Sequence, residues 1–445
     1  MTTTPLVALQ RPKDISLDEL EAELSAIWHS QSGGDKSAPI ATRASTFSMV
    51  VYEPEEFQQL LAVLSFYKGP IDGTYGEDTK AAVELAQKAF GLPVTRWIDP
   101  PTLARLRQEV AQLPPERFNI PNINLRGASV SEAIAAQNPC RIITLCSTLG
   151  EDMGVQAEVS AYCPVQKSSN SNLICCEYIT LRGTKTALNR VGGLVKSLLI
   201  PDLPKFLWWK ATPNPEQELF KQLIESCHCL ILDSSYFAAP ESEFLKMKTL
   251  IDAGTSIADL NWHRLQPWQE LTAAAFDPPE RRSALVEVDR ITIDYEKGNV
   301  SQAFMFLSWI ASRLGWQPQS YSETGGDYDL KHIVLTGAND REIIAELAAI
   351  PTADPGEIVG DLIGLSLSST NPNADCSTII CSETTGCMRM EAGGKAQAAR
   401  TAQVTASNDQ KAEFLLSQQL QRWGRDALYE ESLEVAVQIL GVKQG

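Results

Sequence analysis

Three of the ten cysteines lie close together in the stretch from Cys376 to Met390, which reads CSTIICSETTGCMRM. Apolar, β-branched residues lead into the polar segment Ser382 to Gly386, and a second short run follows, a pattern typical of a β-hairpin. With this segment as the loop, Cys381 and Cys387 face each other across two strands. Directly opposed strand positions have Cβ atoms about 4.5–5.5 Å apart, slightly more than the roughly 3.5–4.5 Å of a disulfide. The spacing therefore predicts that a modest twist lets these two thiols bond.

Other interpretations of the cysteines stay open. Cys376 lies on the opposite strand face from Cys381 if the run is regular, so it is the weaker candidate partner. All three could also be small buried hydrophobic residues, as most free cysteines are. The sequence assigns no role to the other seven, which are Cys140, Cys146, Cys163, Cys175, Cys176, Cys227 and Cys229.

No metal or cofactor site is expected. Zinc sites need clustered ligands, whereas the four histidines are scattered singly, at His29, His228, His263 and His332. Cys175 and Cys176 are adjacent, and the run from Cys227 to Cys229 is too compact for a zinc knuckle. Each lone histidine is better explained as a core or surface residue.

No active site is recognisable either. The segment Ser147 to Gly154, after a buried strand, is neither a Gly-x-Gly-x-x-Gly dinucleotide turn nor a Walker loop. Other strand ends offer Asp233-Ser234-Ser235 and Asp289, without an identifiable nucleophile and base. Trp208 and Trp209 are expected in a core strand. We therefore do not expect an enzyme.

Composition limits the class of protein. The 445 residues are 44% hydrophobic and 21% charged, which indicates a folded chain of about three domains. A net charge of −17 argues against nucleic-acid binding, which needs a basic face. No apolar run reaches the roughly 18 residues that span a bilayer, and no signal peptide is visible. We expect a cytoplasmic protein that binds no membrane, and in that compartment a disulfide is more often regulatory than structural.

Strand and helix patterns alternate through the middle of the chain, which predicts an α/β fold whose mostly parallel central sheet carries helices on both faces. The strand patterns cover 45–52, 141–146, 157–163, 173–181, 205–209, 229–233 and 285–295. The helix patterns cover 17–29, after a capping box from Ser16 to Glu19, and 187–199, 216–226, 241–251, 262–275 and 301–314.

From Asp329 onward the pattern becomes that of an antiparallel sheet. Its strands are expected at 332–336, 342–347, 357–368, the cysteine hairpin and 399–405, although 342–347 could also be a short helix. A long amphipathic helix from Gln410 to Leu440, broken near Gly424, is expected to close this α+β region.

Residues 55–110 form a separate helical unit. Its features are a helix around Leu61, a tight turn from Lys68 to Gly73, a second helix from Thr79 to Phe90 closed by Gly91, and a third begun by Asp99-Pro100. The pattern from Gly69 to Val83, followed by Gln87 and Gly91-Leu92, resembles the peptidoglycan-binding three-helix module over nearly 60 residues. With no export signal and no zinc ligands, we expect this module to dock a protein.

Three further stretches resemble the OpcA family, the glucose-6-phosphate dehydrogenase assembly proteins, in its cyanobacterial form. They are Cys381-Ser-Glu-Thr-Thr-Gly-Cys387-Met-Arg-Met-Glu-Ala-Gly-Gly394, Pro351-Thr-Ala-Asp354 with Gly360-Asp-Leu-Ile-Gly364, and Asn138-Pro-Cys-Arg141. The resemblance covers essentially the whole chain. It implies a central α/β domain at 1–52 and 120–325, an inserted peptidoglycan-binding-like module at 53–115, and a C-terminal domain with the cysteine hairpin at 326–445.

The resemblance implies a non-catalytic partner that binds glucose-6-phosphate dehydrogenase and raises its activity. It also implies thioredoxin-dependent redox control in which the oxidised form is effective, which favours Cys381 and Cys387 as the redox disulfide with Cys376 as the alternative partner. Two rival functions remain. One is an α/β enzyme acting on a phosphorylated sugar, and the other is a glycan-binding structural protein.

Overall fold

The computed structural model describes residues 6–31, 41–43, 45–54, 57–68, 77–112, 139–148, 151–164, 173–237, 239–277, 279–297, 299–351, 361–371, 374–382, 387–394, 401–406, 412–422 and 424–443. Most of the predicted turn from Lys68 to Gly73 lies outside these ranges. No helix in the described ranges is long and apolar enough to cross a membrane. The chain divides into two compact units, namely Met1–Leu232 with Thr255–Ala258 and Ala412–Gly424, and Asp233–Gly254 with Asp259–Lys411 and Arg425–Gly445.

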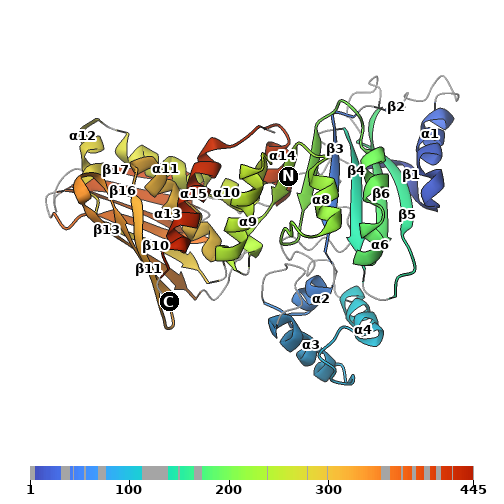
Figure 1. The fold of residues 1–445 in the computed structure, drawn as a ribbon, viewed down its shortest axis with the longest axis horizontal. Coiled ribbons are helices and arrows are strands. Elements are labelled where there is room, and N and C mark those ends of the chain that lie inside the picture. The colour runs from blue at the N-terminus through green and yellow to red at the C-terminus, as the bar shows by residue number, and fades with distance from the viewer. Residues whose placement is uncertain are drawn as a thin grey trace. The chain divides into compact units, whose positions relative to one another are not determined.

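The first unit contains a nine-stranded sheet (Figure 1). Its strands lie in the order β1 (Leu6–Ile15), β5 (Gln156–Pro164), β6 (Leu173–Gly183), β4 (Cys140–Ser147), β3 (Phe47–Glu53), β7 (Lys205–Trp209), β8 (Cys229–Leu232) and β9 (Ile257–Asp259), with β2 (Ala41–Arg43) beside β6. Neighbouring strands are parallel in the series β6, β4, β3, β7 and β8. β5 is antiparallel to both of its neighbours, β1 and β6. The mostly parallel sheet is therefore confirmed, and β3 is buried along its whole length, as such sheets require.

The strand order identifies the architecture more closely. Counted along the chain, β3, β4, β6, β7, β8 and β9 are strands one to six, and in space they lie as 3-2-1-4-5-6. This is the order of the doubly wound nucleotide-binding sheet. The helices of this unit, beside the module described next, are η1 (Leu17–Glu19), α1 (Leu20–Gln31), α6 (Lys185–Asn189), α7 (Gly192–Leu198), α8 (Glu218–Ile224) and α14 (Ala412–Gln419).

Three helices lie in the chain between the adjacent strands β3 and β4, and they form a module with its own core. They are α2 (Phe57–Val63), α3 (Glu77–Ala89) and α4 (Pro100–Ala111). Leu61, Val83 and Leu106 are fully buried together in this core. As predicted, Asp99 caps α4 by accepting a hydrogen bond from the Thr102 N–H, and Gly91 adopts a positive φ of 66° after α3.

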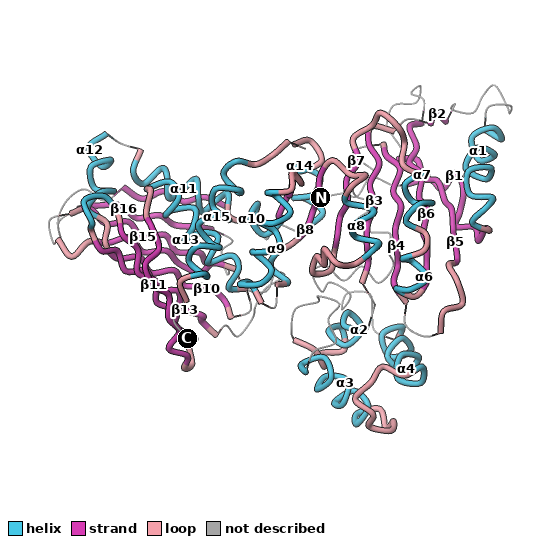
Figure 2. Tube along the Cα trace, viewed as in Figure 1, coloured by secondary structure: helices cyan, strands magenta, loops and turns pink. Residues whose placement is uncertain are grey.

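The second unit contains an eight-stranded mixed sheet. Its order is β11 (Gln317–Gly325), β12 (Leu330–Thr336), β13 (Glu342–Ile350), β10 (Arg290–Glu296), β14 (Leu362–Ser368), β15 (Asp375–Ser382), β16 (Cys387–Gly394) and β17 (Thr401–Ala406). Its helices are η3 (Ser234–Tyr236), α9 (Pro240–Asp252), α10 (Leu260–Arg264), α11 (Gln266–Phe276), α12 (Pro279–Arg282), η4 (Ser283–Glu287), α13 (Val300–Leu314), η5 (Ala338–Asp340) and α15 (Ala427–Gly441). The strands of both sheets are magenta in Figure 2.

Several expectations are corrected. The strand expected at 285–295 was assigned to the central sheet, but β10 pairs with β13 and β14 in the second sheet. The division into units accordingly falls after Leu232, whereas the domain boundary at 325/326 stays a prediction. Residues 342–347 belong to a strand, and the C-terminal helix is two helices, α14 and α15, broken as expected. At the predicted capping box, the Ser16 hydroxyl donates to the Glu19 carboxylate at 2.7 Å instead of capping a backbone N–H.

Candidate functional site

The cysteine hairpin predicted from the sequence is present as the antiparallel pair β15 and β16. Its register differs by one residue from the expected one, because Cys381 lies opposite Met388 and Cys387 lies opposite Ser382. The two cysteines are therefore neighbours across the ladder without being directly paired. The side chains of Cys376, Cys381 and Cys387 lie outside the described residues, so the disulfide stays a prediction.

Five other cysteines have described side chains, and these carry no disulfide: Cys140, Cys146, Cys176, Cys227 and Cys229. Burial raises the pKa of Cys227 to about 12 and that of Cys229 to about 11. Burial also raises the pKa of Cys140 well above its usual value, with a further contribution from neighbouring Cys176. Since the thiolate is the reactive form, these three thiols are poor nucleophiles at neutral pH.

The edge of the first sheet where β3 and β7 end is the place where doubly wound sheets bind ligands. Here the Lys210 ammonium pairs with the buried Glu53 carboxylate and lies 4.4 Å from the centre of the Trp208 ring. Tyr52 stacks on Trp209 with ring centroids 3.9 Å apart. The tryptophans are 5% and 1% exposed, which confirms them as core strand residues.

The sequence after β3 has no glycine-rich turn of the kind that holds a dinucleotide. The first strand of such a fold is followed by a glycine-rich turn whose N–H groups approach the pyrophosphate, but β3 is followed by Pro54-Glu55-Glu56. Residues 55 and 56 lie outside the described residues, and the sequence places no glycine there. Among the described residues at this strand end, the Lys210 ammonium is already paired with the Glu53 carboxylate and is therefore less available to an anionic ligand.

The strand end at Asp233 is an ion-pair clamp. Arg264 donates to both carboxylate oxygens of Asp233, at 2.8 and 2.7 Å, and the Ser235 hydroxyl donates to the same carboxylate at 2.6 Å. Burial raises the pKa of Asp233, but Arg264 and Ser235 outweigh burial and hold it below its usual value. A carboxylate held by a bidentate arginine and a serine hydroxyl, with a lowered pKa, is a structural anchor and a weak base.

Asp259, at the end of β9, is held less completely. Its Oδ1 atom accepts the backbone N–H groups of Ser234 and Asn261 at 2.9 and 3.0 Å. Its Oδ2 atom and the Tyr429 hydroxyl are both buried and have no hydrogen-bond partner among the described residues. Burial, with a further contribution from Asp233, raises the pKa of Asp259 to about 6. Burial disfavours the charged form of a carboxyl, which explains the direction of this shift.

The last strand end singled out from the sequence, Asp289, is also occupied by structural partners. Its carboxylate accepts hydrogen bonds from the Thr370 N–H and hydroxyl and from Arg341, at 2.9, 2.6 and 2.9 Å. Burial raises the pKa of Asp289, and these partners reverse the shift and lower it. The sequence could not reveal these partners, because they lie 52 and 81 residues away.

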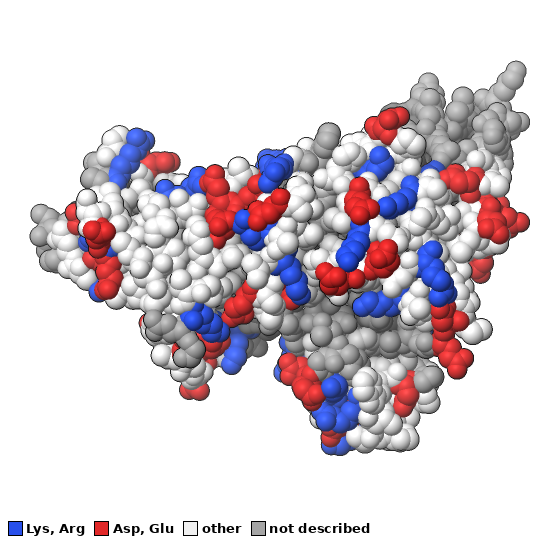
Figure 3. All heavy atoms as spheres, in the orientation of Figure 1, with Lys and Arg blue, Asp and Glu red and all other residues white. Residues whose placement is uncertain are grey.

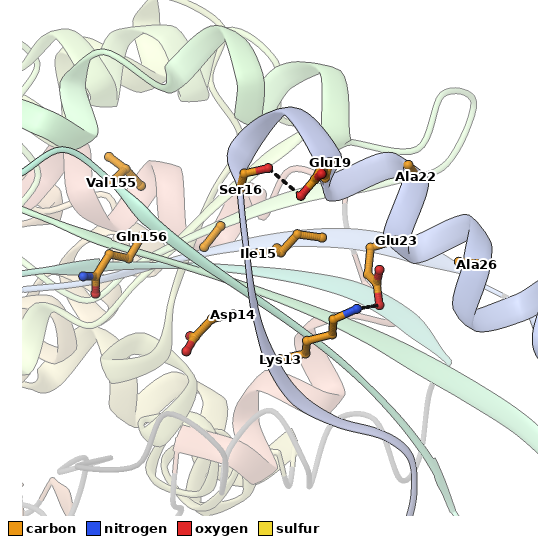
Figure 4. A pocket seen from close by; sticks show the side chains of 11 residues that line it. Lys13, Asp14, Ile15, Ser16, Glu19, Ala22, Glu23, Ala26, Val155 and Gln156 are labelled. Atoms are coloured by element: carbon orange, nitrogen blue, oxygen red, sulfur yellow. Dashed lines mark hydrogen bonds and ion pairs between the residues drawn. The ribbon is translucent and has the colours of Figure 1, made fainter.

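A shallow pocket of about 900 Å³ lies between the end of β1, the start of α1 and β5 (Figure 4). Lys13 points to Glu23 in this pocket and forms an ion pair with it at 2.6 Å. Asp14 and Glu19 supply two more carboxylates to the lining. Because the single ammonium is paired and the remaining charges are negative, this pocket does not suit a phosphorylated sugar.

Charge on the described surface is mixed. Figure 3 shows Lys and Arg side chains interspersed with Asp and Glu over the visible face, without a broad basic patch among the described residues. His332 forms an ion pair with Glu346 at 3.5 Å, and His228 accepts the Lys205 backbone N–H at 3.0 Å. No group of three or more metal-ligating side chains comes together within the described ranges.

Most of this chain matches the two domains of one known protein family. Residues 131–249 match the family described as glucose-6-phosphate dehydrogenase subunit N-terminal domain, and residues 255–433 match the corresponding C-terminal domain. A protein of Synechococcus elongatus named putative OxPP cycle protein OpcA is 57% identical over 434 residues, covering 98% of this chain and 97% of that protein. The chain belongs to the OpcA family. The resemblance stated from three short stretches of sequence is thereby confirmed.

Two further sequence similarities agree with this assignment. A Nostoc punctiforme OpcA protein is 55% identical and covers 99% of this chain and 96% of that protein. Residues 52–106 match the putative peptidoglycan binding domain, which agrees with the module recognised in this OpcA-family chain. Among solved structures, the 3-ketoreductase KijD10 of Actinomadura kijaniata, in complex with NADP and TDP-benzene, is 9% identical with a TM-score of 0.38 and covers 60% of this chain and 83% of that one.

Proposed function

We propose that this chain is a non-catalytic partner that assembles with glucose-6-phosphate dehydrogenase and raises its activity in the oxidative pentose phosphate pathway. The observation that carries the proposal is the match of both dehydrogenase-subunit domains within a chain that aligns almost end to end with OpcA relatives. Two observations at the strand ends of the doubly wound sheet support a non-catalytic role. Lys210 is paired with Glu53, and the sequence after β3 has no glycine-rich turn.

The proposed activation is allosteric. An activator must bind the productive conformation of the enzyme more tightly than the idle one. Couplings of this kind are typically about 1–3 kcal/mol, which corresponds to a several-fold to hundredfold change in apparent substrate affinity. The activation is therefore greatest when the sugar phosphate is subsaturating.

The proposed regulation is by redox state in the cytoplasm. Oxidation joins Cys381 to Cys387, or to Cys376 as the alternative, and the oxidised hairpin presents the surface that the dehydrogenase binds. A thioredoxin-type dithiol reduces the bond and weakens the complex. The support is the hairpin itself, whose paired strands carry Cys381 and Cys387 one ladder step apart, although on different faces.

The test is dehydrogenase activity at subsaturating glucose 6-phosphate, with and without this protein, after oxidation or reduction of the protein. Stronger activation by the oxidised form is the expected result. Activation that is equally strong in both states, or equally strong in a Cys381→Ser, Cys387→Ser variant, would refute the switch. No activation in either state would refute the partnership.

The match of residues 52–106 to a peptidoglycan binding domain favours a second candidate, a glycan-binding role for the module. Co-sedimentation of the protein with purified peptidoglycan is the test. The module has its own buried core, so substitutions on the surface of α3 and α4 leave the sheet of the first unit intact. Such variants can be compared with the parent chain for sedimentation. Failure to sediment leaves the module as a docking element for protein.

A further inference from the structure

The register at the tip of the cysteine hairpin places its two thiol-bearing positions on different faces. Residues directly opposed in an antiparallel pair share one face, and successive residues along a strand alternate between faces. Cys387 lies opposite Ser382, and Cys381 lies opposite Met388. Position 387 therefore shares its face with position 382, while position 381 is on the other face.

A disulfide needs Cβ atoms about 3.5–4.5 Å apart, and two cysteines whose Cα–Cβ bonds point away from each other cannot be bridged without backbone movement. The described register is therefore incompatible with a bond between Cys381 and Cys387. A slip of the whole of β16 by one residue would cure the mismatch, but it would turn every residue of the strand to the opposite face. A local change at the tip is sufficient and disturbs far less of the ladder.

We propose that closure of the Cys381–Cys387 disulfide creates a β-bulge in β16, in which Cys387 and Met388 together oppose Cys381. A bulge of this kind sets two residues of one strand against one of its partner. The ladder from Ile380 opposite Arg389 onward keeps the register that it has now. This inference rests on the redox pair of the proposed function and adds the backbone change by which the pair acts.

The redox step balances without a bound cofactor. Two thiols of the hairpin lose two protons and two electrons and form one S–S bond, while the disulfide of a thioredoxin-type acceptor gains them and becomes a dithiol. Reduction runs the same exchange backwards, through a mixed disulfide. The backbone returns to the described register once the S–S bond is broken.

The bulge changes the surface beyond the two cysteines. Bulges bend the strand that carries them and increase its local twist. β16 pairs with β17 through Cys387 opposite Ala406 and Met388 opposite Thr405, so the end of β17 moves with the tip of β16. Oxidised and reduced chains thus offer the dehydrogenase two different backbones at this edge of the second sheet.

Deletion of Met388 should allow the Cys381–Cys387 disulfide to form without a bulge. Without Met388, Cys387 is directly opposite Cys381 while Ile380 stays opposite Arg389, so no bulge is needed. We expect backbone amide exchange at 387–389 and 404–406 to differ several-fold between the oxidised and reduced parent chain, and to be the same in both states of the deletion variant. A Cys381→Ser variant is the matched control and should resemble the reduced parent under both conditions.

The experiment tests the bulge and the redox switch separately. Peptide mapping of the oxidised parent must show the Cys381–Cys387 bond, and its absence overturns both the switch and the bulge. If the bond forms but exchange at 387–389 is unchanged, or the deletion variant still shows redox-dependent exchange there, the bulge is refuted while the redox switch stands.

Discussion

Replacing Asp259 by Asn should stabilise the second unit at alkaline pH. Burial raises the pKa of Asp259 to about 6, so the fold favours the protonated form. The stabilisation from this proton is fully present below the unfolded pKa of about 4 and is lost as pH rises through about 6. Relative to the fully protonated protein, the free energy of unfolding is lower by about 1 kcal/mol at pH 5, where mainly the unfolded chain ionises, and by about 3 kcal/mol at pH 8.

The asparagine suits the site chemically. Its Oδ1 atom can keep the hydrogen bonds from Ser234 and Asn261, and Asn is as good a helix N-cap as Asp. Its amide group takes the place of the Oδ2 atom, which has no hydrogen-bond partner among the described residues. The variant therefore loses a buried charge and keeps the two hydrogen bonds that the carboxylate accepts.

The assay is amide hydrogen exchange of peptides from α10 and α15, measured at pH 5 and pH 8 and corrected for the intrinsic rate. The free energy of protection should be higher in the variant than in the parent, and this difference should be larger at pH 8 than at pH 5 by about 1–2 kcal/mol. Tyr429→Phe is the control, because it removes an uncharged group and its effect should not depend on pH. If Asp259→Asn lowers protection equally at both pH values, the reasoning is wrong and the site needs the negative charge.

Three other predictions concern stability. Arg264→Met leaves Asp233 buried without its partner and should cost about 3–5 kcal/mol near neutral pH, less in acid as Asp233 protonates, by urea unfolding of the second unit. Lys210→Met should lower the free energy of unfolding of the first unit by a similar amount. Adding Glu53→Gln should recover much of that loss in a double-mutant cycle, whereas additive losses would show that the pair is not coupled. Leu61→Ala, at a fully buried position, should cost about 2–5 kcal/mol within the module, with exchange rising in α2 to α4 and not in β4.

Local sequence predicted the strands of the cysteine hairpin but not their register. Its strands and loop were predicted because β-branched residues flank a polar, glycine-containing segment, and that signal is local. The register was missed by one residue. Both Ser382 and Gly386 suit a loop, and the choice between a four-residue and a five-residue loop depends on how β15 and β16 align with β14 and β17.

The sheet order could not be predicted for a related reason. A doubly wound nucleotide-binding sheet is normally recognised by the glycine-rich turn after its first strand, and here Pro54-Glu55-Glu56 stands in that place. The strand expected at 285–295 has the apolar pattern of a buried strand in either sheet, so nothing local assigned it to β13 and β14. The clamp between Asp233 and Arg264 joins residues 31 positions apart, and the sequence offers no signal for such a pair.

The place of the three-helix module in the chain restricts how this protein can be shortened. β3 and β4 are parallel neighbours, so the chain leaves β3 at one edge of the sheet and must re-enter β4 at the other. For the seven residues of β3 that return covers about 23 Å, and parallel crossovers need about a dozen residues or more. A truncated chain may dispense with α2, α3 and α4, but it must retain a tether of that reach, since a tight turn would force β4 to run antiparallel and dismantle the sheet.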